Sequence, residues 1–261
     1  MNTKHFISVI VLIGSLGLMT STAVAQPPGT VDCDRGDSIQ AAVDRQVGHS
    51  GPITINVSGT CEEYVTIQRD DVTINGNNSA TISGTVRIEN ANRIFILDIT
   101  ITGPNQGLIV SRGSVQVINS SLSQNAGDGL WVIRNSWAEL FNSTASENGA
   151  SGAFVQASKF EANDSKLQNN ANDGILLSIG SGAIVRNSKI TGNLTEGIVA
   201  QLHSVIQLRD GVEVSGNSQG ASISRDSALI ISTSDVMFPD TLSCDDTESS
   251  FENDGGVPTG G

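Results

Sequence analysis

Short runs of alternating apolar and polar residues recur along most of this chain. Two of them are Leu130-x-Val132 and Ile175-x-Leu177. Alternation with a period of two over three to five residues predicts short β-strands that bury one face. Asn, Asp, Ser and Gly separate the runs, and these residues tolerate the left-handed backbone of tight corners. The pattern therefore predicts short strands joined by corners.

The polar residues between these runs repeat at a fixed interval. An Asn or Asp recurs with spacings of 23, 21, 23, 22, 23 and 23 residues: Asn75, Asp98, Asn119, Asn142, Asp164, Asn187 and Asp210. A glycine follows nine or ten residues after all but the first: Gly107, Gly129, Gly152, Gly174, Gly197 and Gly220. Further asparagines precede the last five glycines by three or four residues: Asn125, Asn148, Asn170, Asn193 and Asn217. Such a register is typical of a solenoid with coils of roughly 22 residues.

Three short strands and three corners per repeat form one coil, and coils stack at ~4.8 Å, the spacing of paired strands. Stacking places equivalent side chains above one another. Two aliphatic interior columns are expected: Leu108, Leu130, Ala153, Ile175, Ile198, Ala221, and beside them Val110, Val132, Val155, Leu177, Ala200, Ile223. Corner Asn and Asp side chains can bond to adjacent coils and satisfy the backbone there. The sequence predicts an all-β parallel β-helix of about eight coils.

The open edge of the first coil needs protection, because unpaired strands invite pairing with other chains. Asp37 or Ser38 can cap a helix over about residues 37–47 whose apolar residues fall on one face. Cys33 and Cys61 flank this capping helix and the first strand. They are the preferred disulfide pair, with Cys244 left over, although the connectivity stays open.

The two ends of the chain are expected to lie outside the solenoid, which spans 26–244. Residues 1–25 contain Lys4, an apolar stretch and the small-x-small sequence Ala23-Val24-Ala25, which together predict a signal peptide. The expected location is therefore secreted or periplasmic. This apolar stretch is too short for a stable membrane span, and no second one follows. Residues 245–261 are acidic and Gly-rich, which predicts a disordered tail.

The charge balance restricts the partners. Asp and Glu number 27 against 14 Lys and Arg, and the net charge is −13. Nucleic acids and anionic membranes are disfavoured, because their binding needs Lys and Arg. A polyanionic polysaccharide is also disfavoured unless cations bridge the charges. The scattered histidines and cysteines predict no metal site and no cofactor.

The helix sequence SIQAAV (38–43), the stretch VTIQRDDVTINGN (65–77) and the Asn-x-x-x-Gly repeats resemble the right-handed parallel β-helix superfamily. This superfamily includes pectate lyases and polygalacturonases, and the resemblance covers roughly residues 31–244. It implies a right-handed coil and a ligand lying along the outer face of one sheet. In lyases of this superfamily, Asp residues hold Ca²⁺ there and Arg or Lys acts as base. A role for Ca²⁺ is expected here only if the protein is a lyase.

The corresponding outward column reads Thr66, Arg87, Ile109, Trp131, Phe154, Leu176, Val199, Ser222, and it contains no Asp cluster. Its apolar members Ile109, Trp131, Phe154 and Leu176 have three interpretations. They are a platform for sugar rings, a protein contact such as a homodimer seam, or a stripe covered by neighbouring loops and side chains.

Carboxylates beside this column are the candidates for chemistry. Asp128, Asp173 and Glu196 each precede a column glycine, and Asp173 and Glu196 occupy successive coils, ~5 Å apart. Such a pair could supply acid and nucleophile to a glycosidase or bind a cation, or both could be solvated corner residues. Arg134 could meet an acidic sugar or be a solvated surface residue.

The expected function is therefore binding of a polysaccharide or a protein partner along this face, without catalysis. The alternative is a polysaccharide lyase or glycoside hydrolase that uses Asp128, Asp173 or Glu196 with Arg134.

Overall fold

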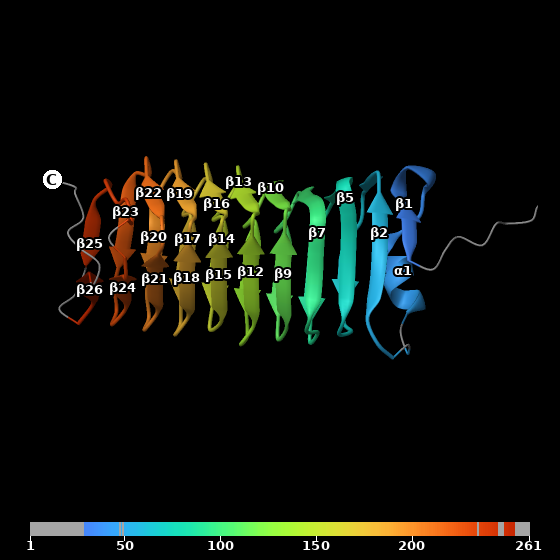
Figure 1. The fold of residues 1–261 in the computed structure, drawn as a ribbon, viewed down its shortest axis with the longest axis horizontal. Helices are drawn as coiled ribbons and strands as arrows, with labels where there is room; N and C mark the ends of the chain where they lie inside the picture. The colour runs from blue at the N-terminus through green and yellow to red at the C-terminus, as the bar shows by residue number, and fades with distance from the viewer. Residues whose placement is uncertain (1–28, 47, 49, 234, 245–247, 254–261) are drawn as a thin grey trace, which may run out of the picture.

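The structure, a computed structural model, describes residues 29–253 except 47, 49, 234 and 245–247. The predicted signal peptide therefore lies outside the described residues. The described chain is a parallel β-solenoid of about ten turns, with α1 (Ile39–Arg45) at one end and β25 and β26 at the other (Figure 1). The predicted fold class is confirmed, and the coil count of about eight was too low. The additional turns lie at the ends, where the asparagine–glycine signature is missing.

From β2 to β23, each coil contributes one strand or strand segment to each of three parallel sheets. The first sheet has nine strands: β4 (Val65–Ile67), β6 (Val86–Glu89), β8 (Leu108–Ser111), β11 (Leu130–Ile133), β14 (Ala153–Gln156), β17 (Ile175–Ser178), β20 (Glu196–Ala200), β23 (Gln219–Ile223) and β25 (Leu242–Cys244). Adjacent strands pair in register, so that Trp131 stands opposite both Ile109 and Phe154.

The second and third sheets are continuous through the long strands β5 (Val72–Ser83) and β7 (Ile94–Gly103). The second sheet also contains β2 (Ile53–Ser58), β9 (Ser114–Ile118), β12 (Trp137–Phe141), β15 (Lys159–Asn163), β18 (Gly182–Arg186), β21 (Val205–Arg209), β24 (Ala228–Ile231) and β26 (Ser250–Asn253). The third sheet also contains β3 (Thr60–Cys61), β10 (Ser121–Asn125), β13 (Thr144–Ser146), β16 (Lys166–Gln168), β19 (Lys189–Thr191) and β22 (Glu213–Ser215). β1 (Thr30–Asp32) pairs with the end of β2.

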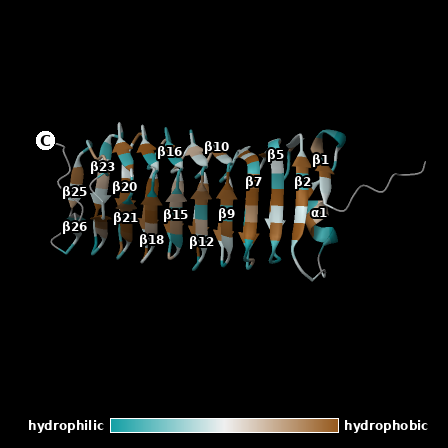
Figure 2. Ribbon diagram, viewed as in Figure 1, coloured by the Kyte–Doolittle hydropathy of each residue, from teal (hydrophilic) through white to brown (hydrophobic). Residues whose placement is uncertain are grey.

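The core is a continuous aliphatic bore. Leu130, Ala153 and Ile175 are fully buried and face one another across successive coils, as the repeat predicts. The strands are banded with apolar and polar residues (Figure 2), and the inward-facing positions along them are apolar and buried. Burial of this one face along each strand is the main force that holds the coils together.

The second set of asparagines forms a ladder inside the corner that leads into the first sheet. Each Nδ2 donates to the Oδ1 of the next asparagine at 2.9–3.0 Å, from Asn125 through Asn148, Asn170 and Asn193 to Asn217. Asn217 donates in turn to the Asp240 carboxylate. We call this row the asparagine ladder. It satisfies buried backbone groups at a corner where no strand pairing is available.

Serines satisfy the backbone at the other two corners, which the sequence analysis did not anticipate. At one, the backbone N–H groups of Ser120, Ser143 and Ser165 each donate to the hydroxyl of the next serine in the row. A second row runs along the remaining corner: Ser136, Ser158, Ser181, Ser204 and Ser227. The first Asn/Asp column has left-handed φ values of 46–54° at six of its seven positions, Asn75 being the exception.

The capping helix begins at Ser38, whose hydroxyl accepts a hydrogen bond from the Ala41 N–H. Glu63 also caps this helix, because its carboxylate accepts from the N–H groups of Ile39 and Gln40. The helix is thereby attached to the loop that leads into β4. Cys33 and Cys61 form a disulfide, and Cys244 is free and exposed. No helix among the described residues is long and apolar enough to cross a membrane.

The C-terminal segment differs from its prediction. Ser250–Asn253 forms β26 and pairs with β24, although disorder was expected from residue 245 onward. Phe251 is partly buried against the core and gives this strand an apolar contact. The acidic residues around Phe251 led to the prediction of disorder. Residues 245–247 and 254–261 of the expected tail lie outside the described residues.

Candidate functional site

The outward column of the first sheet has the register that the sequence predicts. Thr66 and Arg87 lead into Ile109, Trp131, Phe154, Leu176 and Val199 through consecutive parallel pairings. We call the five apolar members, Ile109 to Val199, the apolar ladder. They extend along the solenoid axis over five coils, ~20 Å from end to end.

The apolar ladder is half-buried rather than open. Ile109 is only 6% exposed, which corrects its prediction as an exposed residue, since its neighbours in the column, Arg87 and Trp131, are both larger. The Trp131 and Phe154 rings stack with centroids 6.2 Å apart and planes 9° apart. The two rings are therefore parallel neighbours in adjacent coils, and a ligand would contact the outer edges of the ladder. The Trp131 Nε1 is buried without a hydrogen-bond partner.

A polar row borders the apolar ladder where the chain enters the first sheet. It consists of Gln106, Asp128, Ser151, Asp173, Glu196 and Gln219. Asp173 is buried, with 8% of its surface exposed, so it is no solvated corner residue. Its Oδ1 accepts a hydrogen bond from the Thr195 hydroxyl at 2.5 Å and one from the Glu196 N–H at 3.3 Å. The structure thus brings Asp173 and Glu196 together, as predicted.

Burial raises the pKa of the Asp173 carboxyl to about 6, from an ordinary value of 3.8. The nearby Glu196 carboxyl acts in the same direction, and the Thr195 hydrogen bond opposes it. Burial also raises the pKa of Asp128, whose Oδ1 accepts from the Ser151 N–H at 3.0 Å. This row can therefore carry a proton in mildly acidic solution.

A raised pKa in the folded protein makes stability depend on pH. The folded state holds the Asp173 proton more tightly than the unfolded chain, so this contribution is complete below pH 3.8 and is lost as the pH rises through about 6. Asp173→Asn removes the titration. Urea unfolding measures the difference in free energy of unfolding between the variant and wild type. This difference should shift by about 2 kcal/mol in favour of the variant when the pH is raised from 4 to 8. An equal difference from wild type at both pH values would contradict the raised pKa.

Arg134 does not join the carboxyls of the polar row. It stands at the far end of β11, exposed, and its guanidinium reaches the Ser111 hydroxyl at 3.5 Å. Asp128 precedes the same strand by two residues. The six residue steps from Asp128 to Arg134 span roughly 20 Å when extended. This separation is too long for the two groups to act on one bond.

Tyr64 and Glu89 also border this face and were missed, whereas Arg87 was placed in the outward column without a role. Arg87 contacts Glu89 at 3.2 Å, and this hydrogen bond, with a smaller contribution from Tyr64, raises the pKa of the guanidinium. Tyr64 is half exposed and is the only tyrosine of the chain. It precedes β4 at the position that a glycine occupies in later coils, and this departure from the repeat was the available signal.

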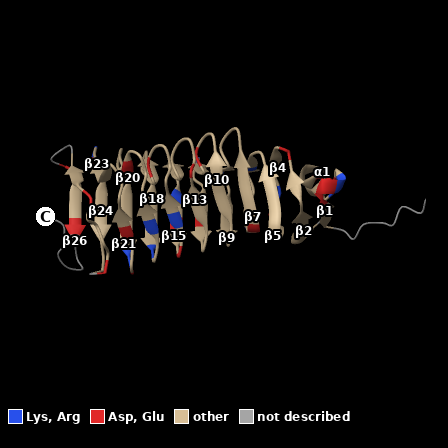
Figure 3. Ribbon diagram, turned by 90° about the horizontal axis from the view of Figure 1, so that it is seen from above, with Lys and Arg blue, Asp and Glu red and all other residues tan. Residues whose placement is uncertain are grey.

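No metal centre is formed by the described residues. The one group of three ligating side chains within 4.8 Å is Cys33, Cys61 and Glu63. Its cysteines are joined in the disulfide and its carboxylate caps α1. Lys and Arg lie on β15, β18 and β21 of the second sheet (Figure 3), whereas the first-sheet strands from β8 to β23 contain none.

Comparison with known proteins identifies the architecture. A family model described as right handed beta helix region matches residues 52–184 and 106–237. The alginate lyase from Paenibacillus sp. str. FPU-7 superposes with a TM-score of 0.63 at 14% identity, over 88% of this chain and 96% of that one. Pectate lyase Pel9A gives 0.54 at 13% identity, over 83% and 76%. The enzymatically active domain of Bacteriophage CBA120 tailspike protein 2 gives 0.53 at 10% identity, over 81% and 44%.

No curated protein matches this sequence. At identities this low, the structural similarities establish the fold alone. They carry no site residue across to this chain.

Proposed function

This chain belongs to the right-handed β-helix family, and from that premise we propose that it is an exported protein that binds a neutral polysaccharide along the first sheet. The observation that carries the proposal is the apolar ladder in register beside the polar row. A sugar chain offers C–H groups and hydroxyls together. It would place the former against the ladder edges and the latter against Gln106, Asp128 and Glu196, members of the polar row that are only partly buried.

Three further observations support a polysaccharide. Two fold neighbours are an alginate lyase and a pectate lyase, which are enzymes that act on polysaccharides. A solenoid face repeats its chemistry once per coil, which suits a ligand that is itself a repeating polymer. The predicted signal peptide and the Cys33–Cys61 disulfide favour an oxidising compartment outside the cytoplasm, where such polymers occur.

The charge distribution favours a neutral ligand. The chain carries a net charge of −13, and the first-sheet face holds Asp128, Asp173 and Glu196 without a Lys or Arg from β8 to β23. An anionic polysaccharide would be repelled from this face and drawn toward the basic residues of the second sheet. A protein partner or a second copy of this chain remains the alternative occupant of the apolar ladder, and the binding test decides between them.

Retardation in native gels that contain soluble polysaccharide tests the proposal. Wild type should be retarded in at least one neutral gel among glucan, xylan and galactomannan, and not in alginate. Trp131→Ala should lower the affinity obtained from the retardation about 30-fold, because a half-buried Trp at the centre of a binding face contributes most of the affinity. Phe141→Ala is the matched control, since Phe141 is an exposed aromatic on the second sheet.

Equal retardation of Trp131→Ala and Phe141→Ala would remove the first-sheet face from the binding site. Retardation in alginate alone would contradict a neutral ligand. Circular dichroism of each variant establishes that the fold is retained. Sedimentation at several concentrations tests the homodimer alternative, which predicts a dimer that Trp131→Ala dissociates.

Glycoside hydrolysis is a second candidate, favoured by the pKa of Asp173. An acid with a pKa of about 6 beside a second carboxyl has the properties of a general acid in glycosidases. Release of reducing ends at pH 5, abolished in Asp173→Asn, would support hydrolysis. The lyase alternative has less support, because Arg134 lies at the other end of the strand from the acids.

A further inference from the structure

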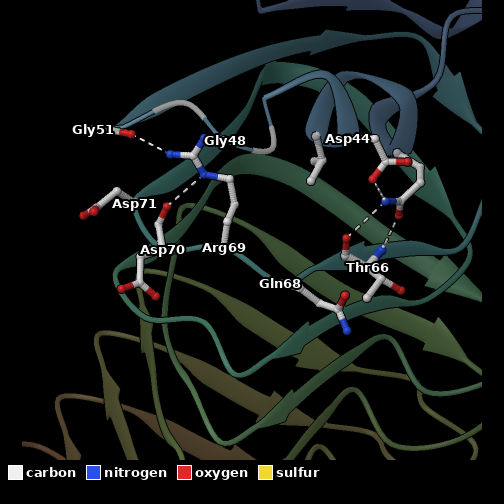
Figure 4. A pocket seen from close by; sticks show the side chains of 10 residues that line it. Asp44, Gly48, Gly51, Thr66, Gln68, Arg69, Asp70 and Asp71 are labelled. Atoms are coloured by element: carbon white, nitrogen blue, oxygen red, sulfur yellow. Dashed lines mark hydrogen bonds between the residues drawn. The ribbon is translucent and has the colours of Figure 1, made fainter.

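A hollow of about 600 Å³ lies between the capping helix and the first coil (Figure 4). Gln40 and Asp44 of α1 form one wall. Thr66 of β4 and Gln68, directly after that strand, form another, and the corner from Arg69 to Asp71 closes the third side, facing Gly51. Its volume falls within the range of roughly 300–1,000 Å³ that is typical of small-molecule sites.

The walls of this hollow are held in place by hydrogen bonds. The Gln40 side chain accepts from the Thr66 N–H at 2.6 Å and donates to the Thr66 carbonyl at 3.2 Å, as a neighbouring strand would. Gln40 also donates to Asp44. The Arg69 guanidinium donates to the carbonyls of Gln46 at 2.7 Å and Gly51 at 2.5 Å, which fixes the opposite wall. A site formed in advance in this way loses little conformational entropy on binding.

The hollow is in line with the proposed binding face. Thr66 pairs in register with Arg87, which pairs with Ile109 at the start of the apolar ladder. Two coils, ~10 Å, therefore separate Thr66 from the ladder along the solenoid axis. Beyond Thr66 the path ends, because α1 covers the edge of the first coil. A polymer that follows the column toward the N-terminal end of the solenoid meets this hollow last.

The chemistry of the lining suits one uncharged sugar unit. Thr66, Gln68 and the exposed Asp44 line the hollow (Figure 4), and the Gln68 amide also donates to the Glu89 carboxylate at 3.4 Å. Asp71 and Asp70, in contrast, are already engaged by Arg93, at 2.6 Å and 3.2 Å. They are thus poorly placed to hold a cation. The N–H groups of Arg69 donate to backbone carbonyls, and the three carboxylates of the lining outnumber this one cation, so an anionic ligand is disfavoured.

We propose that this hollow binds the terminal sugar unit of the neutral polysaccharide whose following units lie along the apolar ladder. The inference rests on the proposed function and adds to it that the protein recognises a chain end. The buried side chain of Val43 supplies an apolar floor, while Thr66, Gln68 and Asp44 supply donors and acceptors for the ring hydroxyls.

Calorimetric titration with cellohexaose, xylohexaose and mannohexaose tests this site. Thr66→Val together with Gln68→Ala should weaken binding of the best hexasaccharide about 10-fold or more, since two hydrogen-bonding groups are lost. Retardation of the same variant in the polysaccharide gel should stay within about 2-fold of wild type, because long chains present few ends. Thr191→Val with Gln168→Ala, the same pair of changes on the third sheet, should leave both measurements unchanged.

A second titration uses the wild-type protein, so that the chain-end site can be tested even if a variant fails to fold. The best hexasaccharide is capped at its reducing end or at its non-reducing end. Capping one end should weaken binding about 10-fold, and capping the other should have little effect. Equal binding of both capped forms, or unchanged binding by the Thr66 and Gln68 variant, overturns the chain-end site while the proposed function stands. Loss of all polysaccharide binding by wild type overturns both.

Discussion

Replacing Asn170 with alanine is expected to lower the free energy of unfolding by about 4 kcal/mol. Asn170 is fully buried at the centre of the asparagine ladder. Its Nδ2 donates to the Asn193 Oδ1 at 2.9 Å and to the Ala145 carbonyl at 3.2 Å. Its Oδ1 accepts from both the N–H and the Nδ2 of Asn148. Alanine leaves these buried groups unsatisfied at roughly 1–3 kcal/mol each.

Urea unfolding followed by circular dichroism measures this effect. Asn172→Ala is the control, because Asn172 is an exposed asparagine of the same corner. Its substitution should change stability by less than about 0.5 kcal/mol. Equal stability of Asn170→Ala and Asn172→Ala would show that the asparagine ladder does not support the corner.

The second large effect is expected from Gly129→Ala, which should destabilise the protein by about 3 kcal/mol. A Cβ at this position would lie 2.6 Å from the Asn148 Nδ2 and 2.9 Å from the Gly152 carbonyl oxygen. Neither neighbour can move freely, because the asparagine ladder holds Asn148 and the next coil holds Gly152. Overpacking of this kind typically costs 1–3 kcal/mol, and here it also disturbs the ladder (~1 kcal/mol more).

Gly182→Ala is the matched substitution, because a Cβ on Gly182 would meet no atom within 4 Å. Its stability should stay within about 0.5 kcal/mol of wild type, since the new methyl group enters open space above the second sheet. Thermal or urea unfolding of the two variants side by side gives the comparison. A destabilised Gly182→Ala with an unaffected Gly129→Ala would refute the close packing of the glycine column.

The repeat made the architecture predictable. Because each coil buries one face of short strands, the periodic positions in the sequence are also vertical neighbours in space. The register Ile109–Trp131–Phe154–Leu176 therefore followed from spacing alone, as did the interior columns. The capping helix followed from its apolar face and the N-cap at Ser38, although it is shorter than expected.

Exposure and chemistry at the face were less predictable. Spacing places Trp131 beside Phe154 but does not determine that their rings lie parallel in a stack. Asp173 has the same position in its repeat as Asp128, yet its burial and the Thr195 hydrogen bond depend on local packing. The serine rows were not predicted, because serine is common in this chain and its role at the corners depends on backbone geometry.

Hydroxyl-radical footprinting with the polysaccharide that gives the strongest gel retardation tests the central claim most directly, because it reports the solvent access of individual side chains. If side chains about 22 residues apart form one binding face, bound polysaccharide should protect Trp131, Phe154 and Leu176 together. The second-sheet residues Trp137 and Phe141 should remain as reactive as in the free protein. Protection of Trp137 and Phe141 with none at Trp131 and Phe154 would contradict it.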